Sequence, residues 1–380
     1  MKRGVVTILS VDGGGVRGLV PALIVRDLMR RIGMIDGIIR RRIRRTRREP
    51  DGSPVERRLW GRLHAPGPTV ADIFDFFAGT STGALLALGF AKENPYTADD
   101  IAETYRRHSR TIFPISRFAS VRAMRQAFAE KYDALPLESV LEDLFGDQRL
   151  QDCTGNVLVT AYDTDNRGPY FFKHYTDAAL RKNRALREKH DPPEDFFLKD
   201  VARATSAAPT FFQGAEITSL SGRKYSFLDG GLVANNPALS AYVEARKIWR
   251  HARRYVILSI GTGRSGRRFA HDAIRKWGYL DWVSPVQGVP MLSFMMDGQS
   301  ESAAHALKNL PRIDYYRINF DIDVVSEEMD DARPENIAAI EAMAGRVIKT
   351  HSADLHRLAK VLYQEWRRRH GLRGPRTASR

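Results

Sequence analysis

Cysteine is almost absent from this 380-residue chain, and that absence excludes one class of protein immediately. Cys153 is the only cysteine, so no disulfide can form within the chain and a small disulfide-stabilised secreted fold is excluded. Zinc-type spacing of cysteine and histidine is also missing. We therefore expect Cys153 to be a small buried apolar residue, and we expect a reducing, cytoplasmic location for the protein.

Long hydrophobic runs are missing as well. No stretch of about 18 consecutive apolar residues occurs, so the sequence predicts no membrane-spanning helix. Residues 5–11 are apolar and follow the basic start Met1-Lys2-Arg3, but no small-residue cleavage site comes after them. We interpret this segment as a buried first strand, not as a signal peptide.

Acidic residues are in the minority. Lysine and arginine number 60 against 45 aspartates and glutamates, and the formal net charge is +15. Much of the excess lies in residues 40–48 and 367–380. No nucleic-acid recognition motif and no interleaved aromatic residues accompany these runs, which disfavours nucleic acid as a partner. The sequence leaves two interpretations open: peripheral contact with an anionic membrane surface, and a solvated loop and tail.

Two glycine-rich motifs are present, each directly after an apolar run. Residues 5–11 lead into Asp12-Gly13-Gly14-Gly15-Val16-Arg17-Gly18, and residues 74–78 lead into Gly79-Thr80-Ser81-Thr82-Gly83. The second motif, G-x-S-x-G between a strand and a helix-forming run, is the context of a nucleophile elbow. Backbone N–H groups of the first motif could stabilise an oxyanion at the point where Ser81 attacks.

The first motif has a second interpretation, because G-x-G-x-x-G after a strand is also the fingerprint of dinucleotide binding. A nucleotide- or nucleic-acid-binding protein that uses this loop for phosphate is therefore the alternative function. It requires a second strand ending in an acidic residue about 20 positions later. Asp36 is the available residue, and its surroundings do not resemble the end of a strand.

A third motif places Asp229 in a glycine-rich turn, Phe227-Leu228-Asp229-Gly230-Gly231, ahead of Asn235-Asn236-Pro237. Together, the three motifs resemble those of the patatin-like phospholipases, over about residues 4–265. The part that begins at Met295-Met296-Asp297 is similar to the tail of bacterial members. Two further likenesses are Ala204-Thr205-Ser206-Ala207-Ala208-Pro209 and Ser259-Ile260-Gly261-Thr262-Gly263.

The resemblance implies a lipid acyl hydrolase that cleaves fatty acyl esters of phospholipids or related glycerolipids through an acyl-enzyme. It implies that Ser81 is the nucleophile, that Asp229 accepts its proton in a Ser–Asp dyad, and that no metal or organic cofactor takes part. Gly13, Gly14 and Gly15 would form the oxyanion hole. The supporting motif residues would be Asp12, Arg17, Gly18, Gly79, Gly83, Gly230 and Gly231.

Alternating apolar and amphipathic segments indicate an α/β fold, a three-layer α/β/α sandwich with a mostly parallel central sheet. We expect a catalytic domain over 4–265, a C-terminal helical extension over 266–366 that packs on the same core, and a basic tail over 367–380. Strands are predicted at 4–11, 73–78, 156–161, 170–172 and 255–260. Helices are predicted at 17–33, 81–93, 198–206, 335–347 and 353–367, with broken helix over 97–145 and a long inserted loop over 37–68.

Two functional details remain as expectations. Phe211 and Phe212 either line an acyl channel or pack in the core. Asp229 acts as the base directly or, in the alternative of a Ser–His–Asp triad, one of the later histidines such as His251, His271 or His305 does so. Because a carboxylate has an ordinary pKa of about 3.9, a direct dyad predicts activity that survives to mildly acidic pH.

Overall fold

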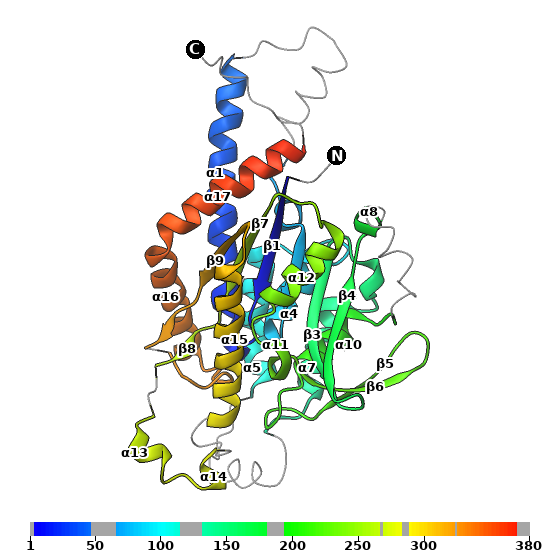
Figure 1. Ribbon diagram of the computed structural model, residues 1–380, viewed down its shortest axis with the longest axis vertical. Helices are drawn as coiled ribbons and strands as arrows, with labels where there is room; N and C mark the ends of the chain where they lie inside the picture. The colour runs from blue at the N-terminus through cyan, green and yellow to red at the C-terminus, as the bar shows by residue number, and fades with distance from the viewer. Residues whose placement is uncertain are drawn as a thin grey trace.

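The structure, a computed structural model, describes residues 4–46, 66–114, 131–180, 194–266, 269–282, 289–323 and 325–370. A twisted sheet stands in the middle of the molecule, and helices cover both of its faces (Figure 1). The predicted three-layer α/β arrangement is therefore confirmed. In the described residues, no helix is long and apolar enough to cross a membrane.

Eight strands form the central sheet in the order β5-β6-β3-β2-β1-β7-β9, and β4 pairs with β3 beside this path. The pairs among β1, β2, β3, β7 and β9 are parallel, whereas β4, β5 and β6 pair in antiparallel fashion. The bounds are β1 Val5–Val11, β2 Phe76–Gly79, β3 Asn156–Asp163, β4 Gly168–His174, β5 Ala215–Thr218, β6 Lys224–Asp229, β7 Arg254–Ile260 and β9 Ile313–Ile318. A separate pair consists of β8 Arg264–Ser265 and β10 Asp321–Ile322.

Two groups of helices enclose the sheet. The larger hydrophobic core contains side chains of α1 Leu19–Thr46, α4 Thr82–Ala91, α5 Ala98–Ile112, α7 Leu135–Phe145, α10 Leu198–Thr205, α16 Pro334–Thr350 and α17 Ser352–Arg369. The smaller core contains side chains of α12 Ala238–Ile248 and α15 Pro290–Asn309. Short helical turns are η1 Gly15–Gly18, α3 Val70–Ile73, η2 Leu150–Asp152, α8 Asp177–Leu180, α11 Gly231–Ala234, α13 His271–Ile274 and α14 Tyr279–Trp282.

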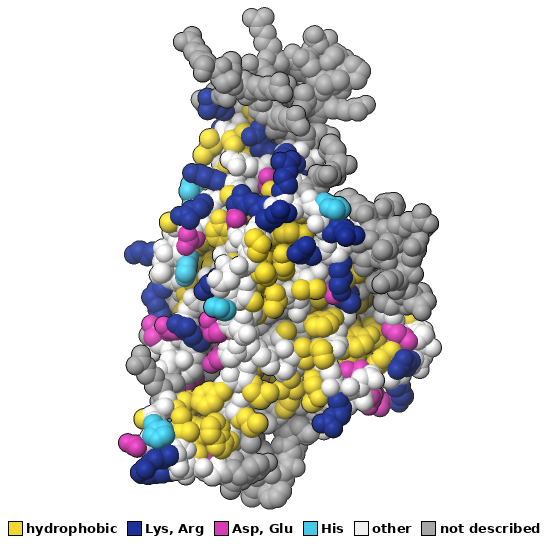
Figure 2. Space-filling model, viewed as in Figure 1, with side chains coloured by type: hydrophobic (Ala, Val, Ile, Leu, Met, Phe, Trp, Pro, Cys, Tyr) yellow, Lys and Arg dark blue, Asp and Glu magenta, His cyan; other side chains and the backbone are white. Residues whose placement is uncertain are grey.

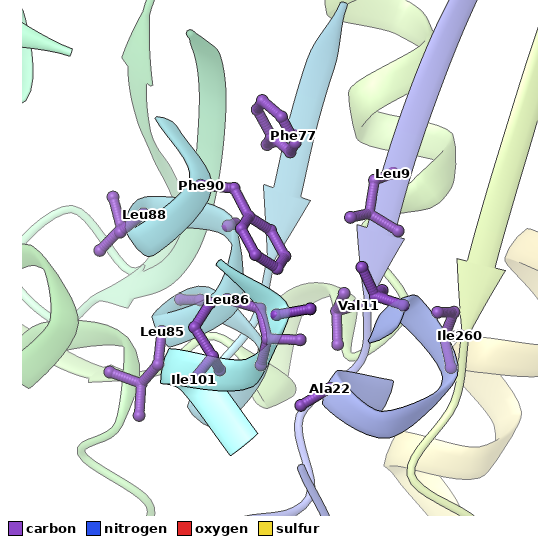
Figure 3. Close-up of a cluster of buried hydrophobic side chains, with 14 of the residues drawn as sticks. Leu9, Val11, Ala22, Phe77, Leu85, Leu86, Leu88, Phe90, Ile101 and Ile260 are labelled. Atoms are coloured by element: carbon purple, nitrogen blue, oxygen red, sulfur yellow. The ribbon is translucent and has the colours of Figure 1, made fainter. Parts of the chain in front are cut away.

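Strand β1 shows why the sheet is buried on both faces. Successive side chains of a strand point to opposite sides, and β1 is apolar at five of its seven positions, which include both sides. Leu9 and Val11 enter the larger core, where Phe77 of β2 lies beside α4 (Figure 3). Val6 and Ile8 enter the smaller core on the other face.

Helix α1 is longer than the sequence predicts. A helix over 17–33 followed by a loop over 37–68 was expected, but α1 continues to Thr46. The cause is a buried polar contact: Asp36 accepts hydrogen bonds from Arg40 Nε at 2.7 Å and from the Tyr363 hydroxyl of α17 at 2.8 Å. The start of the arginine run is thus helical and packed against α17, while residues 47–65 lie outside the described part of the chain.

Three smaller predictions are also corrected. The strand expected at 73–78 begins at Phe76, because Thr69 caps the helical turn α3 just before it. The extension over 266–366 is not purely helical, since it contributes β9 to the sheet. The basic tail expected at 367–380 begins later, because α17 runs to Arg369 and residues 371–380 lie outside the described residues. Arg369 Nη2 donates to Asp75 Oδ2 at 2.9 Å, which fixes the end of α17 to the sheet.

Candidate active site

Ser81 occupies a strained turn between β2 and α4. Its backbone has φ 51° and ψ −129°, a conformation that residues with a side chain rarely adopt. A Cβ on Gly79 would lie 2.4 Å from the Gly83 carbonyl oxygen, and a Cβ on Gly83 would lie 2.4 Å from the Val11 carbonyl oxygen. Only glycine permits this close approach of strand and helix, so the G-x-S-x-G motif forms the sharp turn that the sequence predicts.

The glycine loop lies directly beside this turn. A Cβ on Gly13 would come within 3.0 Å of Ser81 Cβ, and Gly14 and Gly15 line the same pocket as Ser81. Within the described residues, the N–H groups of Gly13 and Gly14 donate to no protein acceptor. Two N–H donors next to Ser81 therefore remain available.

The other residues of this loop hold its shape. Arg17 is buried, and its Nη1 donates to the Glu327 carbonyl oxygen at 3.2 Å. The contact favours a structural role for Arg17 over contact with substrate. Gly18 follows, packed against the hydroxyl end of Tyr105.

The sheet brings Asp229 to Ser81 although 148 positions in the sequence separate them. Strand β2 pairs in parallel with the first half of β3 and ends with Gly79 opposite Val159. Strand β6 pairs in antiparallel fashion with the second half of β3 and ends with Asp229 opposite Ala161. The two strands therefore end facing each other along β3, about two residues or roughly 7 Å apart.

The Asp229 carboxylate is buried and held in place. The N–H of Gly231 donates to its Oδ1 at 2.7 Å, while the backbone of Gly230 is anchored by an N–H bond of 3.2 Å to the Thr205 carbonyl oxygen. Burial raises the pKa of Asp229 to about 6, although the Gly231 N–H and the Ser81 hydroxyl both favour the ionised form and bring the pKa part of the way down. Asp229 can therefore accept a proton near neutral pH, the property required of a general base.

A mostly apolar pocket opens beside these groups. Ser81, Asp229, Gly14 and Gly15 form its polar end. Most of the remaining wall is hydrophobic: Val16, Leu85, Ile112, Phe113, Leu137, Val140, Leu141, Phe211, Phe212, Leu232, Leu292 and Met296. Phe212 also packs against Phe113 at 5.9 Å between ring centroids, so it serves both the pocket and the core. The pocket suits a long apolar chain attached to a polar reacting group.

Asp12 connects this site to the far end of the sequence. Arg317 on β9 donates to both of its carboxylate oxygens, at 2.8 and 2.6 Å, and both side chains are buried. The pair holds the residue at which β1 becomes the glycine loop. Sequence reasoning missed Arg317, and it also missed Thr205, whose hydroxyl oxygen accepts the Ser81 N–H at 2.8 Å. Thr205 lies in the quoted Ala204–Pro209 motif, which is the signal that could have found it.

Replacement of Arg317 by methionine should destabilise the protein strongly. It leaves the buried Asp12 carboxylate without its partner, a change that typically costs about 3–5 kcal/mol of unfolding free energy. The matched control is Arg264→Met, because Arg264 pairs with Asp321 at the surface, where such a pair contributes about 1 kcal/mol or less. Urea unfolding compares the two variants, and equal losses would refute the structural role of the Asp12–Arg317 pair.

The comparisons with known proteins agree with this geometry. Residues 9–242 match the family model described as patatin-like phospholipase, which is more than half of the chain. The chain belongs to the patatin-like phospholipase family. As a member of that family, it is a lipid acyl hydrolase.

Several plant relatives are similar over most of their length. Patatin-like protein 2 of Oryza sativa subsp. indica is 27% identical, over 97% of this chain and 95% of the relative. Patatin-like protein 2 of Arabidopsis thaliana is 28% identical over 88% and 79%, and Patatin-T5 of Solanum tuberosum is 27% identical over 94% and 89%. Among solved structures, VipD from Legionella pneumophila matches with a TM-score of 0.35 and 12% identity, over 92% of this chain and 67% of that chain.

The alternative of a dinucleotide-binding loop is wrong for this family member. That fold needs a second strand that ends in an acidic residue, but Asp36 lies in the middle of α1 and is bonded to Arg40 and Tyr363. The next strand, β2, ends at the Ser81 turn instead. The histidines weighed for a triad do not line the pocket, although His108 of α5 does.

Proposed function

We propose that this family member is a serine acyl hydrolase of the phospholipase A type, in which Ser81 and Asp229 form a dyad without histidine. The observation that supports the proposal is the meeting of the Ser81 hydroxyl with a buried carboxylate of raised pKa at the polar end of an apolar pocket. The substrate class is phospholipids or related glycerolipids, whose acyl chains match the pocket wall.

The proposed reaction uses the chain's own groups throughout. Asp229 takes the Ser81 proton as Oγ attacks the ester carbonyl, and the tetrahedral intermediate collapses to an acyl-enzyme and a released lysolipid or alcohol. Asp229 returns its proton to the leaving oxygen. A water molecule, activated by the same carboxylate, then hydrolyses the acyl-enzyme and releases a fatty acid.

Gly13, Gly14 and Gly15 are the proposed oxyanion donors, and Gly14 offers the sharpest test. A Cβ at this position would lie 2.1 Å from Thr262 Oγ1, so Gly14→Ala must displace the loop. Loss of one oxyanion donor typically costs about 3 kcal/mol of transition-state stabilisation, so we expect kcat to fall roughly a hundredfold with little change in KM. The control is Gly33→Ala in α1, where a Cβ meets nothing within 4 Å. Equal kinetics for the two variants would exclude the assignment.

Labelling with a fluorophosphonate probe tests the proposed nucleophile, and phospholipid vesicles test the substrate class. Peptide mass spectrometry should locate the probe on Ser81. Analysis of the released lipids should find free fatty acid and lysophospholipid in equal amounts, and the isomer of lysophospholipid identifies the acyl position. Labelling at another residue would contradict Ser81 as the nucleophile. Vesicle lipids that stay unhydrolysed while the probe reacts would contradict the substrate class.

We also propose a cytoplasmic protein in peripheral contact with anionic membranes. The net charge of +15 supports the membrane contact, and the presence of a single cysteine supports the reducing compartment. Two arginines of the basic segments do not support this proposal. Arg40 pairs with Asp36 and Arg369 pairs with Asp75, and both arginines are buried or nearly so. Arg41 and Arg42, which follow Arg40 in the sequence, are exposed.

A further inference from the structure

Four aromatic side chains pack on one another outside the two hydrophobic cores. Phe269 contacts Trp277 at 5.1 Å and Phe294 at 5.2 Å between ring centroids. Trp282 closes the ring of contacts, at 4.9 Å from Trp277 and 6.1 Å from Phe294. None of the four is buried in the described structure. Contiguous apolar side chains that stay partly exposed to water are typical of a binding surface, and this cluster indicates one.

Helix α15 extends this cluster and joins it to the pocket. Leu292 and Met296, one helical turn apart, line the pocket beside Ser81. Their neighbours face solvent instead: Met291, Phe294 and Met295 are 52%, 39% and 44% exposed. We call Phe269, Trp277, Trp282, Met291, Phe294 and Met295 the aromatic–methionine surface. The same turn of helix thus presents apolar side chains to the pocket and to the outside.

Charged side chains border this surface. Arg275 and Lys276 are exposed between Phe269 and Trp282 in the sequence, and Arg275 pairs with the exposed Asp272 at 3.5 Å. Figure 2 shows hydrophobic side chains gathered between α13 and the start of α15, with histidine, basic and acidic side chains at the margin. Tryptophan beside basic residues matches the headgroup region of a phospholipid bilayer, where an aromatic ring meets acyl chains and a cation meets phosphate.

The position of this surface fits the transfer of an acyl chain. Each methylene group that leaves lipid for water carries a free-energy cost, so the pocket must open where the protein touches the membrane. The aromatic–methionine surface lies next to the pocket. The C-terminal ends of α1 and α17 lie at the opposite end of the molecule (Figure 1). Arginines there can attract the protein to an anionic surface, but they cannot set the pocket against it.

We propose that the aromatic–methionine surface docks on a phospholipid bilayer and inserts at the boundary of headgroups and acyl chains, with the pocket facing the lipid. This rests on the proposed lipid substrate. A second copy of the chain and a partner protein are the other possible occupants, and the experiments below tell them apart.

Vesicle binding in the Ser81→Ala background tests docking apart from catalysis. The test variant is Met291→Ser/Phe294→Ser. The matched control is Met34→Ser/Ile38→Ser on α1, at side chains that are 51% and 58% exposed. Neutral phosphatidylcholine vesicles at high salt remove the contribution of the arginines. We expect the test variant to bind at least tenfold more weakly than its parent, and the control to bind equally well.

Activity measurements then relate docking to turnover. With Ser81 present, the loss that Met291→Ser/Phe294→Ser causes on vesicles should exceed any loss on a soluble short-chain ester at least tenfold. Fluorescence supplies a direct readout, because brominated lipids should quench Trp277 and Trp282, and Trp277→Phe/Trp282→Phe should remove most of the quenching.

Three results would overturn the proposal: equal vesicle binding by the test variant and its parent, weaker binding by the α1 control alone, or a dimer in sedimentation that the test variant loses. If no lipid ester is hydrolysed but the binding results hold, then the proposed function fails and the docking surface stands.

Discussion

Ser81→Ala is expected to reduce ester hydrolysis by on the order of 10⁴-fold or more, while the fold remains intact. The reason lies in the turn between β2 and α4, which holds the Ser81 hydroxyl at the pocket with no capping bond to its own helix. Alanine keeps the backbone and removes only the hydroxyl that we propose as the nucleophile. Release of fatty acid from phospholipid vesicles measures turnover, and circular dichroism checks the fold.

The matched control for this variant is Ser206→Ala. Ser206 also lines the pocket, so its replacement removes a second hydroxyl from the same wall. We expect Ser206→Ala to keep most of its reaction with a fluorophosphonate probe, whereas Ser81→Ala loses it. If Ser81→Ala were still labelled fully, another nucleophile would have to be sought.

Asp229→Asn is expected to lose nearly all turnover, because an amide cannot take the Ser81 proton. The pH profile should report the same carboxylate. Burial raises the pKa of Asp229 to about 6, so the ionised, active form is lost as pH falls through that value. Activity should therefore fall near pH 6. The sequence alone predicts a fall at lower pH, because it assumes the ordinary pKa of an exposed aspartate.

The loss of activity at low pH does not by itself distinguish a carboxylate base from an imidazole base. The temperature dependence of the apparent pKa and a set of histidine variants distinguish them. Ionisation of a carboxyl group releases or absorbs little heat, and the apparent pKa should shift little between cold and warm assays. A histidine base would shift it clearly. His251→Ala and His305→Ala, at exposed positions, should retain most activity. His108 lines the pocket, and a folded His108→Gln variant as inactive as Ser81→Ala would establish a histidine base instead.

Asp229→Asn should also make the protein more stable above pH 6. A raised folded-state pKa favours the protonated form, so the ionised carboxylate opposes folding at pH 8. The shift from 3.8 to about 6 corresponds to on the order of 3 kcal/mol. Asparagine carries no charge and should recover much of this in urea unfolding at pH 8. The gain should shrink below pH 6, where Asp229 is itself neutral, and a gain of constant size would contradict the assigned pKa.

Local motifs made the positions of the glycine loop and of the Ser81 turn predictable. A glycine-rich turn and a nucleophile elbow are encoded by neighbouring residues, so the positions of Ser81 and residues 12–18 follow from the sequence. Asp229 was predicted through its motif and the family resemblance. Its meeting with Ser81 depends on β2 and β6 ending against the same strand, and no local pattern encodes that pairing.

Other features could not be found because their partners are remote or their composition misleads. Arg317 is one of 60 lysines and arginines, and no pattern near it in the sequence indicates that it pairs with Asp12. The second half of α1 is so rich in arginine that it resembles a loop, yet the hydrogen bonds of Asp36 with Arg40 and Tyr363 join it to α17. Trp277 and Trp282, two of only five tryptophans, lie close in sequence, and that signal was available.

The long sequence separation of the contacts around β1 has a consequence for synthesis of the protein. Asp12 meets its arginine 305 residues later, and Thr7 meets Arg369 after 362 residues. Strand β1 also pairs with β7, which is synthesised much later. A chain still on the ribosome therefore carries Ser81 long before Arg317, which holds the start of the glycine loop, has been made. The Asp12–Arg317 pair can therefore form only after most of the chain has been synthesised.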